Sequence, residues 1–501
     1  MLAVLVGAVA VWGAAPPVVA NAASGGAALA ARVAVPAAGS WGGAIEVPGL
    51  GALNTGEGAR VVSVSCASAG NCAAGGHYQS RHSQQGFVAS ERHGRWGRAI
   101  EIPGLGKLNK GGGADLESVS CGSAGDCTAG GFYSYNVAFF RIAAFVVTER
   151  RGQWGNAVAL PTGDGEVNSV SCASAGNCLA GGDTASAYFY NHNAFLVQEQ
   201  VGHWGHLMAV PGLRTLRHVD SWISSVACPS AGDCTVAGGY DARSGGQQAF
   251  VVTERHGLWG MATEVPGLAT LNAGGNASIV AVSCGAAGTC AAGGYYVDGA
   301  GNYQGFVASE DNGVWLTAIE VPGLAALNAG NRAAVNSLSC GAAGNCTAVG
   351  AYTDAAGHRQ GFVAVQDDGT WGTATGVPGL PALNKDGNAQ VRTVSCASAG
   401  SCAAGGFYTN RSGRRQGFVA EEDNGVWLTA IEVPGLAALS EGGPDGVITV
   451  SCGSPDRCAA GGVYTDASGH HQGFVTQPVT VGPGHRSARA GRISQFVHSV
   501  R

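Results

Sequence analysis

Residues 279–323 read IVAVSCGAAGTCAAGGYYVDGAGNYQGFVASEDNGVWLTAIEVPG, and this stretch holds one complete repeat of the chain. Its first segment, IVAVSC, alternates and is rich in β-branched residues, so it predicts a β-strand. CAAGGYY, QGFVASE and VWLTAIEVPG predict three further strands, separated by a glycine-containing turn and by a tight DNG hairpin, and proline ends the last strand. Four short antiparallel strands are the content of one blade of a β-propeller.

The repeat occurs eight times along the chain. The first cysteines of successive copies are 55, 51, 56, 56, 56, 56 and 56 residues apart. A period near 50 residues is typical of propeller blades or solenoid coils, and four strands per unit favour the propeller because solenoid coils are shorter. The 84 glycines among 501 residues fit many tight turns between short buried strands.

The two ends of the repeat array indicate that the ring is closed. Trp41 opens WGGAIEVPGL, a fourth strand that precedes any cysteine unit, whereas the last unit, which begins VITVSC at residue 447, lacks a tryptophan strand. Joined together, the two pieces make one complete blade and remove the free sheet edges. We therefore predict an all-β fold, an eight-bladed β-propeller of four-stranded antiparallel blades over residues 41–481, closed by the N-terminal strand.

All sixteen cysteines fall into eight C-x5-C pairs, which predict eight disulfides in an oxidising compartment. Zinc sites prefer two to four intervening residues, and a redox dithiol would be C-x-x-C. The pairing leaves no cysteine for catalysis. The pairs are Cys66 and Cys72, Cys121 and Cys127, Cys172 and Cys178, Cys228 and Cys234, Cys284 and Cys290, Cys340 and Cys346, Cys396 and Cys402, and Cys452 and Cys458.

The segments outside the repeats predict export. Residues 1–23 have an apolar core followed by the small-residue site ANA, so we expect a signal peptide, then a linker over 24–40. Residues 482–501 contain four arginines and no acidic residue, and we expect a basic, disordered tail. No later segment approaches twenty apolar residues, so we expect no membrane span and a protein that is secreted or held at the cell surface.

The repeat resembles two known propeller families. Gly-Gly at the end of the second strand, an aromatic residue in the third and a tryptophan in the fourth resemble kelch repeats, best seen in GGYYVDGAGNYQGFVASEDNGVWLTAIEVPG from Gly293. The turn SEDNGVW from Ser309 is similar to the Asp-box of sialidase-like propellers, but departs from it by one residue after the glycine. The resemblance implies a secreted bacterial propeller, which serves as a binding platform or as an enzyme.

Charge and composition disfavour several partners. The net charge of −6 and the 12% charged residues indicate no strong field, so we expect no nucleic-acid partner. The acidic residues in the short turns are too few for a calcium loop, and the histidines form no H-x-x-x-H or H-x-H pair. We expect neither a metal nor another cofactor.

The connections between the second and third strands of the second and third repeats depart from the common pattern. They read FYSYNVAFFRIA from Phe132 and DTASAYFYNHNA from Asp183. Exposed aromatic rings could stack on sugars or hold a protein partner, whereas long loops could instead bury their rings against each other. The candidate ligand-binding residues are Tyr133, Tyr135, Phe140, Tyr188, Tyr190 and His192.

No catalytic constellation stands out in the sequence. The arginines are scattered, unlike the arginine triad of a sialidase, so no catalytic residue is assigned. Glutamates close the third strand of six repeats, and their recurrence predicts a structural role; they are Glu91, Glu149, Glu199, Glu254, Glu310 and Glu421. Five near-identical units favour a secreted, non-enzymatic binding propeller, a monomer with an unknown protein or glycan as its ligand. The alternative is a carbohydrate-active enzyme of sialidase-like or lyase-like type.

Overall fold

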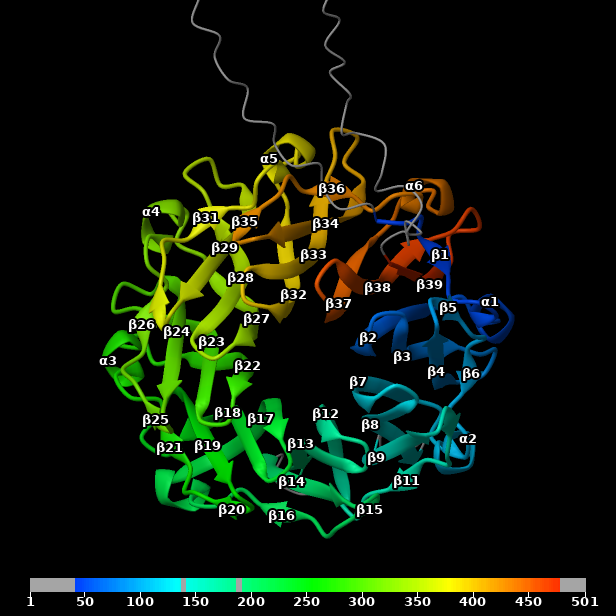
Figure 1. The fold of residues 1–501 in the computed structure, drawn as a ribbon, viewed down its shortest axis with the longest axis horizontal. Coiled ribbons are helices and arrows are strands. Elements are labelled where there is room, and N and C mark those ends of the chain that lie inside the picture. Colours follow the sequence, from blue (N-terminus) through cyan, green and yellow to red (C-terminus); the bar gives the residue numbers. More distant parts are fainter. Residues whose placement is uncertain (1–40, 137–140, 186–191, 478–501) are drawn as a thin grey trace, which may run out of the picture. The chain divides into compact units, whose positions relative to one another are not determined.

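The computed structural model describes residues 41–136, 141–185 and 192–477, and it confirms the predicted eight-bladed propeller (Figure 1). Eight antiparallel sheets follow one another around a ring. Blades 1 to 7 are each built from consecutive strands, and blade 8 combines the last three strands with the first strand of the chain.

The first strand of every blade lines the centre of the ring (Figure 1). Val61 and Val64, with their equivalents, both lie in the core although they are three residues apart. A register shift between Val61 and Ser63 recurs in the other blades and marks a β-bulge. The first strands are β2 (Ala59–Ser68), β7 (Ala114–Ser123), β12 (Asp164–Ser174), β17 (His218–Ser230), β22 (Ala277–Ala286), β27 (Ala334–Ala342), β32 (Gln390–Ser398) and β37 (Gly446–Ser454).

The second and third strands form the body of each blade, where small residues allow neighbouring blades to approach closely. The second strands are β3 (Asn71–Gln79), β8 (Asp126–Asn136), β13 (Asn177–Ala185), β18 (Asp233–Ala242), β23 (Thr289–Val297), β28 (Asn345–Thr353), β33 (Ser401–Thr409) and β38 (Arg457–Thr465). The third strands are β4 (Gln84–Arg92), β9 (Arg141–Arg150), β14 (His192–Gln200), β19 (Gln247–Arg255), β24 (Tyr303–Asp311), β29 (Arg359–Asp367), β34 (Arg415–Asp423) and β39 (His471–Thr476). A phenylalanine in each third strand, such as Phe306, is buried. Burial of this ring stabilises the folded state by roughly 2–3 kcal/mol.

The predicted fourth strand is broken into two short pieces, both paired with the third strand. In blade 5, Trp315 pairs with Glu310 and Ile319 pairs with Val307, so the outer segment has one more residue than its partner between these pairs. The pieces are β5 (Arg95–Trp96) and β6 (Ile100–Glu101), β10 (Gln153–Trp154) and β11 (Val158–Ala159), β15 (His203–Trp204) and β16 (Met208–Ala209), β20 (Leu258–Trp259) and β21 (Thr263–Glu264), β25 (Val314–Trp315) and β26 (Ile319–Glu320), β30 (Thr370–Trp371) and β31 (Thr375–Gly376), and β35 (Val426–Trp427) and β36 (Ile431–Glu432).

A one-turn helix, not anticipated from the sequence, links each blade to the next except between blades 2 and 3, where β11 leads directly to β12. Each begins after a glycine in the left-handed region, such as Gly323 at φ 73°, and buries its first leucine, such as Leu324. Asn328 follows the helix, and its side-chain amide donates to the carbonyl of Tyr303, where the third strand of the preceding blade begins. The helices are α1 (Leu50–Leu53), α2 (Leu105–Leu108), the 3-10 turn η1 (Leu213–Leu216), α3 (Leu268–Leu271), α4 (Leu324–Leu327), α5 (Leu380–Leu383) and α6 (Leu436–Leu439).

Blade 8 is completed by β1 (Ile45–Glu46), as predicted. Ile45 pairs with Val475 of β39, and the backbone N–H of Gly42 donates to the carbonyl of Gln477 at 2.7 Å. Trp41 is only 5% exposed and packs in the core of this blade. The ring is therefore sealed by residues from the two ends of the described chain.

The antiparallel order of strands gives the ring two distinct faces. We call the disulfide face the side that carries the turns between first and second strands and between third and fourth strands. We call the loop face the opposite side, which carries the connections between second and third strands and the helices that join blades. No helix within the described ranges is long and apolar enough to cross a membrane.

Candidate functional site

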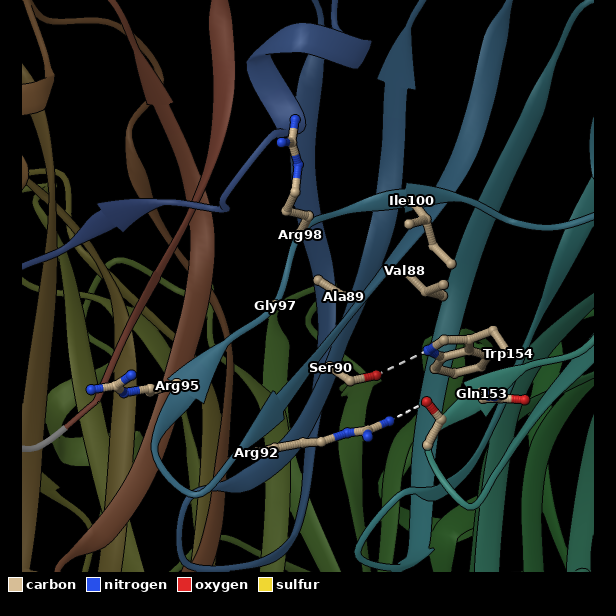
Figure 2. Close-up of a pocket in the computed structure, with 11 residues that line it drawn as sticks. Val88, Ala89, Ser90, Arg92, Arg95, Gly97, Arg98, Ile100, Gln153 and Trp154 are labelled. Atoms are coloured by element: carbon tan, nitrogen blue, oxygen red, sulfur yellow. Dashed lines mark hydrogen bonds between the residues drawn. The ribbon is translucent and has the colours of Figure 1, made fainter.

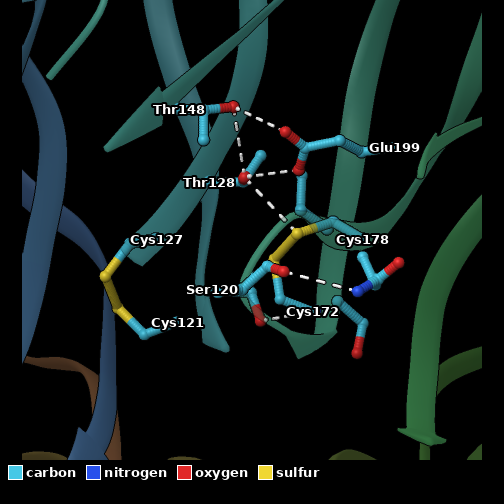
Figure 3. The surroundings of a disulfide bond; sticks show 12 residues. Ser120, Cys121, Cys127, Thr128, Thr148, Cys172, Cys178 and Glu199 are labelled. Carbon is cyan, nitrogen blue, oxygen red and sulfur yellow. Dashed lines mark hydrogen bonds between the residues drawn. A yellow bond between two sulfur atoms is a disulfide. The ribbon is translucent and has the colours of Figure 1, made fainter. Parts of the chain in front are cut away.

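All eight predicted disulfides are present, each at the disulfide-face end of a first and second strand. The two cysteines of a pair lie directly opposite each other in register, as Cys66 and Cys72 do, with Cα atoms 3.9 to 4.1 Å apart across the eight pairs. The second cysteine of each pair is buried. In blade 3, Cys178 packs against the hydroxyl of Thr128 from blade 2 (Figure 3). The disulfides thus staple the inner part of every blade.

Pairs of hydroxyl groups connect the first strands of successive blades at this same end. The Ser63 and Ser65 hydroxyls of blade 1 accept the backbone N–H groups of Val119 and Cys121 in blade 2, both at 3.0 Å. Fourteen such bonds of 2.9 to 3.2 Å follow the ring, and Thr449 and Ser451 of blade 8 close it on blade 1. The sequence signal for this arrangement, not used in the predictions above, is a serine or threonine three residues before the first cysteine and a serine one residue before it. Alanine replaces one of the two only in blades 4 and 5.

The loop-face end of the same strands is different in every blade. The residue three positions before the first hydroxyl position is, in blades 1 to 8, Arg60, Asp115, Glu166, Trp222, Ser278, Ala334, Gln390 and Gly446. The residue one position before it is Val62, Glu117, Asn168, Ser224, Val280, Asn336, Arg392 and Ile448. A repeated scaffold thus presents a unique set of side chains at one end of the ring, and we call this end the mouth.

Blades 1 to 3 contribute an acidic sector to the mouth. His77 Nδ1 lies 2.7 Å from an Asp115 carboxylate oxygen across the boundary between blades 1 and 2. In blade 3, His192 Nδ1 lies 2.6 Å from a carboxylate oxygen of Asp183. Glu117 belongs to blade 2, between the two pairs along the ring. Burial and the nearby charge of Asp115 raise the pKa of Glu117 to about 7. Such a carboxyl group can hold or release a proton near neutral pH.

Blades 6 and 7 contribute an arginine sector. Arg392 and Arg415 place their guanidinium carbons 4.8 and 3.9 Å from the ring centroid of Phe407. Burial and the neighbouring charges of Arg415, Arg60 and Arg359 lower the pKa of Arg392 to about 10. The arginines, interpreted as scattered from the sequence, therefore converge here.

The arginine sector has no carboxylate partner of its own among the residues that the structure describes. The arginine ion pairs in those ranges belong to other residues, namely Arg60, Arg92, Arg141, Arg150 and Arg255. The Nε atoms of Arg359 and Arg415 are buried and make no hydrogen bond in the described part of the chain. Asp445 acts on Arg415 electrostatically, but its oxygens already accept hydrogen bonds from Ser440 and Thr465.

An aromatic sector in blades 4 and 5 lies between the other two along the ring. The Trp222 indole packs over Gly239, where a side chain could not be accommodated. In blade 5 the rings of Tyr295 and Tyr303 are 5.8 Å apart, and Tyr303 is 39% exposed. Exposed aromatic faces beside charged groups are suited to a ligand that has both apolar and polar faces.

The predicted candidate residues are distributed between core, rim and undescribed segments. Tyr133 is buried, in the position that holds a buried tyrosine in six other blades, such as Tyr296 of blade 5. Tyr135 is 38% exposed and donates its hydroxyl to Asp164 at 2.8 Å. His192 belongs to the acidic sector described above. Phe140, Tyr188 and Tyr190 lie outside the described residues.

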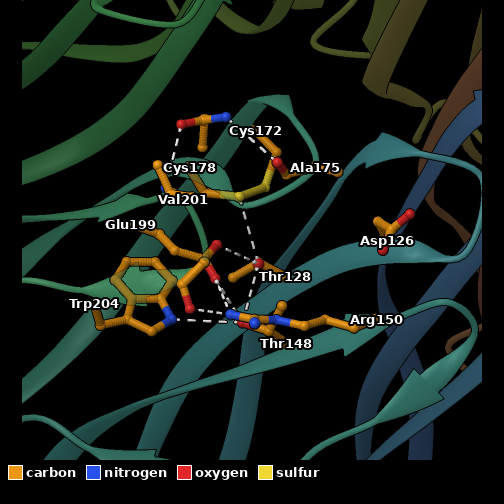
Figure 4. Close-up of polar contacts among 12 residues, drawn as sticks. Asp126, Thr128, Thr148, Arg150, Cys172, Ala175, Cys178, Glu199, Val201 and Trp204 are labelled. Atoms are coloured by element: carbon orange, nitrogen blue, oxygen red, sulfur yellow. Dashed lines mark hydrogen bonds and ion pairs between the residues drawn. A yellow bond between two sulfur atoms is a disulfide. The ribbon is translucent and has the colours of Figure 1, made fainter.

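The recurring glutamates have the structural role predicted for them, with one correction in blade 7. The residue equivalent to Glu91 there is Glu422, which pairs with Trp427, and not Glu421 as expected. These carboxylates are buried and face the preceding blade: Arg150 of blade 2 lies 3.3 Å from Glu199 of blade 3 (Figure 4). The one-residue error arose because the acidic pair in EED is ambiguous until the register is known.

The boundary between blades 1 and 2 has the same arrangement and an additional outer pocket of about 440 Å³. Arg92 reaches the carbonyl of Gly152 and lies 3.6 Å from Glu149, while Ser90 accepts a hydrogen bond from the indole of Trp154 (Figure 2). The pocket opens on the outer edge of the ring, away from the first strands that form the mouth. Its walls are therefore part of the contact between blades.

Comparisons with known proteins do not show a family. No protein-family model matches the sequence, and no curated protein matches it. Among solved structures, a polysaccharide lyase, an ulvan lyase bound to a GlcA-Rha3S unit, has a TM-score of 0.39 at 10% identity, covering 89% of this chain and 96% of that chain. A Hadza microbial sialidase has a TM-score of 0.35 at 10% identity, covering 68% and 73%. Sqt1 of Chaetomium thermophilum has a TM-score of 0.39 at 10% identity, covering 75% and 96%. The kelch-like and Asp-box-like resemblance therefore stays a prediction.

Proposed function

We propose that this chain is an exported, non-enzymatic binding propeller that holds an acidic carbohydrate at the mouth of its loop face. The observation that carries the proposal is the arginine sector of Arg359, Arg392 and Arg415, which lacks a carboxylate partner among the described residues. Guanidinium groups recognise carboxylates and sulfate esters through charge-assisted hydrogen bonds. A ligand with such a group would relieve the repulsion among three clustered cations.

The other sectors favour a sugar as the body of the ligand. Trp222 and Tyr303 offer aromatic faces on which sugar rings can stack, and the carboxylates of blades 2 and 3 can accept hydrogen bonds from hydroxyl groups. Tyr135 and His192 lie at the loop-face ends of the same blades, and we include them at the rim of the site. The aromatic residues predicted at 140, 188 and 190 remain further candidates.

Export and the domain division belong to the same proposal. Eight disulfides fit an oxidising environment. We propose a signal peptide over residues 1–23, a linker over 24–40, the propeller over 41–481 and a basic tail over 482–501, with the mature protein secreted or held at the cell surface as a monomer.

The test compares three polymers that share one backbone: dextran, carboxymethyl dextran and dextran sulfate. We expect the full chain to bind one or both charged polymers and not dextran. Arg392→Gln and Arg415→Gln should each weaken binding at least tenfold, whereas Arg414→Gln, an exposed arginine next in sequence, should change it less than about twofold. Equal binding by all four proteins would contradict the assigned site, because the attraction would then reflect overall charge.

A second function, carbohydrate cleavage, is favoured by one observation. The two histidine–aspartate pairs and Glu117, whose pKa is raised to about 7, provide groups suited to general acid–base chemistry at the same mouth as the arginine sector. Incubation with the bound polymer distinguishes the two functions. New reducing ends would assign a hydrolase, and unsaturated ends a lyase; loss of either activity in Glu117→Gln with binding retained would place the chemistry in the acidic sector.

A further inference from the structure

Three boundaries between blades on the disulfide face share one arrangement of an arginine and a glutamate. At three boundaries, an arginine at the end of a third strand reaches the buried glutamate of the next blade. The pairs are Arg92 with Glu149 at 3.6 Å, Arg150 with Glu199 at 3.3 Å and Arg255 with Glu310 at 3.0 Å. The same guanidinium groups cover the glycine of the next hairpin, at Gly152, Gly202 and Gly313.

One neighbouring boundary replaces both partners together. Between blades 5 and 6 the arginine position is Asp311 and the glutamate position is Gln366. The Gln366 amide donates to Ser309 at 2.8 Å and to the carbonyl of Gly369 at 3.1 Å. The Gln366 amide thus makes the hydrogen bonds of this boundary without any charged group.

The boundary between blades 6 and 7 keeps the glutamate but loses the arginine. The arginine position is Asp367, while Glu422 is only 2% exposed, and both of its carboxylate oxygens lack a hydrogen-bond partner among the described residues. Gly425, the equivalent of Gly152, has open space above it instead of a guanidinium group. A buried carboxylate without a partner is costly, and the arginine that three other boundaries place here is absent.

A pocket of about 280 Å³ occupies this boundary. Glu422 forms part of its wall, and the exposed Asp367 and Asn424 lie at its rim. Asn345, Thr347 and Gln366 of blade 6 and Ser398 of blade 7 add further polar groups to the lining. Since a water molecule takes about 30 Å³ in the liquid, the pocket has room for the end of an arginine side chain. We call it the Glu422 pocket.

We propose that the Glu422 pocket binds a guanidinium group supplied from outside the blade, in the place that Arg92, Arg150 and Arg255 occupy at the other boundaries. The group would donate to the Glu422 carboxylate, and Asp367 would attract it to the entrance. An arginine side chain of a partner protein and a small guanidinium compound share this chemistry. The site is on the face opposite the mouth and does not depend on the proposed function.

The test uses agmatine and the peptide acetyl-Gly-Arg-Gly-amide, each titrated into the full chain at pH 8 and followed by NMR. We expect saturable binding that falls at least tenfold in Glu422→Gln. Asp367→Arg should also abolish binding, because it supplies the guanidinium group from within the chain. Asp311→Arg makes the same charge change opposite Gln366 and should leave agmatine affinity within about twofold of the original.

Each outcome decides the proposal. No saturable binding to the unmodified chain, or equal affinity in Glu422→Gln, would overturn it. Tighter binding of the peptide than of agmatine would support it and identify an arginine side chain as the source, whereas equal affinities would support it with a small compound as the source. Thermal unfolding of Asp367→Arg checks the fold: its Tm should equal or exceed that of the original protein, as the three internal pairs predict.

Discussion

The hydroxyl oxygen of Ser65 lies 3.0 Å from the backbone nitrogen of Cys121 in the next blade and accepts its N–H. The innermost strand of a blade has one edge without a neighbouring strand, so its N–H groups need other acceptors. Here the preceding blade supplies them. The contact between blades is therefore a polar one near the centre of the ring.

This arrangement predicts the effect of two opposite substitutions. Ser65→Ala should lower the stability by about 1 kcal/mol, because the N–H of Cys121 loses its acceptor. Ala281→Ser should raise it by about as much, since blade 5 has alanine where other blades supply a hydroxyl, and Leu338 would gain the missing bond. Urea unfolding midpoints measure both changes. An unchanged midpoint in Ser65→Ala would show that water replaces the hydroxyl without cost.

Removal of one disulfide should have a local and modest effect. The double variant Cys284→Ser with Cys290→Ser opens a loop of only a few residues, for which the chain-entropy model gives about 2 kcal/mol. We expect the variant to fold and to lose protection from hydrogen exchange mainly in blade 5. A loss of protection spread equally over all blades would contradict this local role.

The buried glutamates predict a specific dependence of stability on pH. Burial raises the pKa of Glu91 to about 7, above its value in an unfolded chain, so the protonated form is favoured by folding. Its contribution to stability is full below pH 4.5 and is lost as the pH rises through 7. Glu91→Gln should therefore raise the Tm at pH 8 and have little effect at pH 4.5.

Glu310→Gln is the matched control for that prediction. Glu310 occupies the same position in blade 5, but it has Arg255 as a partner at 3.0 Å. Its removal should lower the Tm at pH 8, because the guanidinium group loses its counter-charge. Thermal melts of the two variants at both pH values would test the contrast, and the same sign of change at pH 8 would contradict it.

Two neighbouring tyrosines of blade 2 should respond differently to truncation. Tyr133→Ala removes a ring that is 8% exposed and should cost about 3–5 kcal/mol, as large aromatic truncations in a core do. Tyr135→Ala removes a ring that is 38% exposed and should cost less than about 1 kcal/mol. Unfolding midpoints distinguish them, and binding experiments at the rim should therefore use only the second variant.

The sequence alone was sufficient for the blade number, the closure and the disulfides because these depend on a repeat with fixed spacing. It was not sufficient for the break in the fourth strand. VWLTAIEVPG has the residues of one continuous strand, and the extra residue between Trp315 and Ile319 appears only when the register with the third strand is known. The one-turn helices were also missed, because four residues carry too little periodicity for a prediction.

The mouth could be predicted only in part. Arg359 and Arg415 are 56 residues apart, one repeat length, so they occupy the same position of adjacent blades. Comparison of the repeats position by position would have brought them together. Arg392 belongs to a different strand. Only the pairing of β33 with both β32 and β34 places Arg392 and Arg415 over the ring of Phe407. Burial and the lack of a counter-charge are likewise properties of the folded ring.

The closure of blade 8 has a consequence for how the molecule is assembled. Residues 45 and 46 are made early in synthesis, yet their partners in β39 lie at residues 474 and 475, so the seam forms last. Until then β39 offers an unpaired edge that residues 41–46 of another chain fit equally well. Chains that fold at high protein concentration should thus exchange these segments and form domain-swapped oligomers. At low protein concentration each chain should complete its own ring.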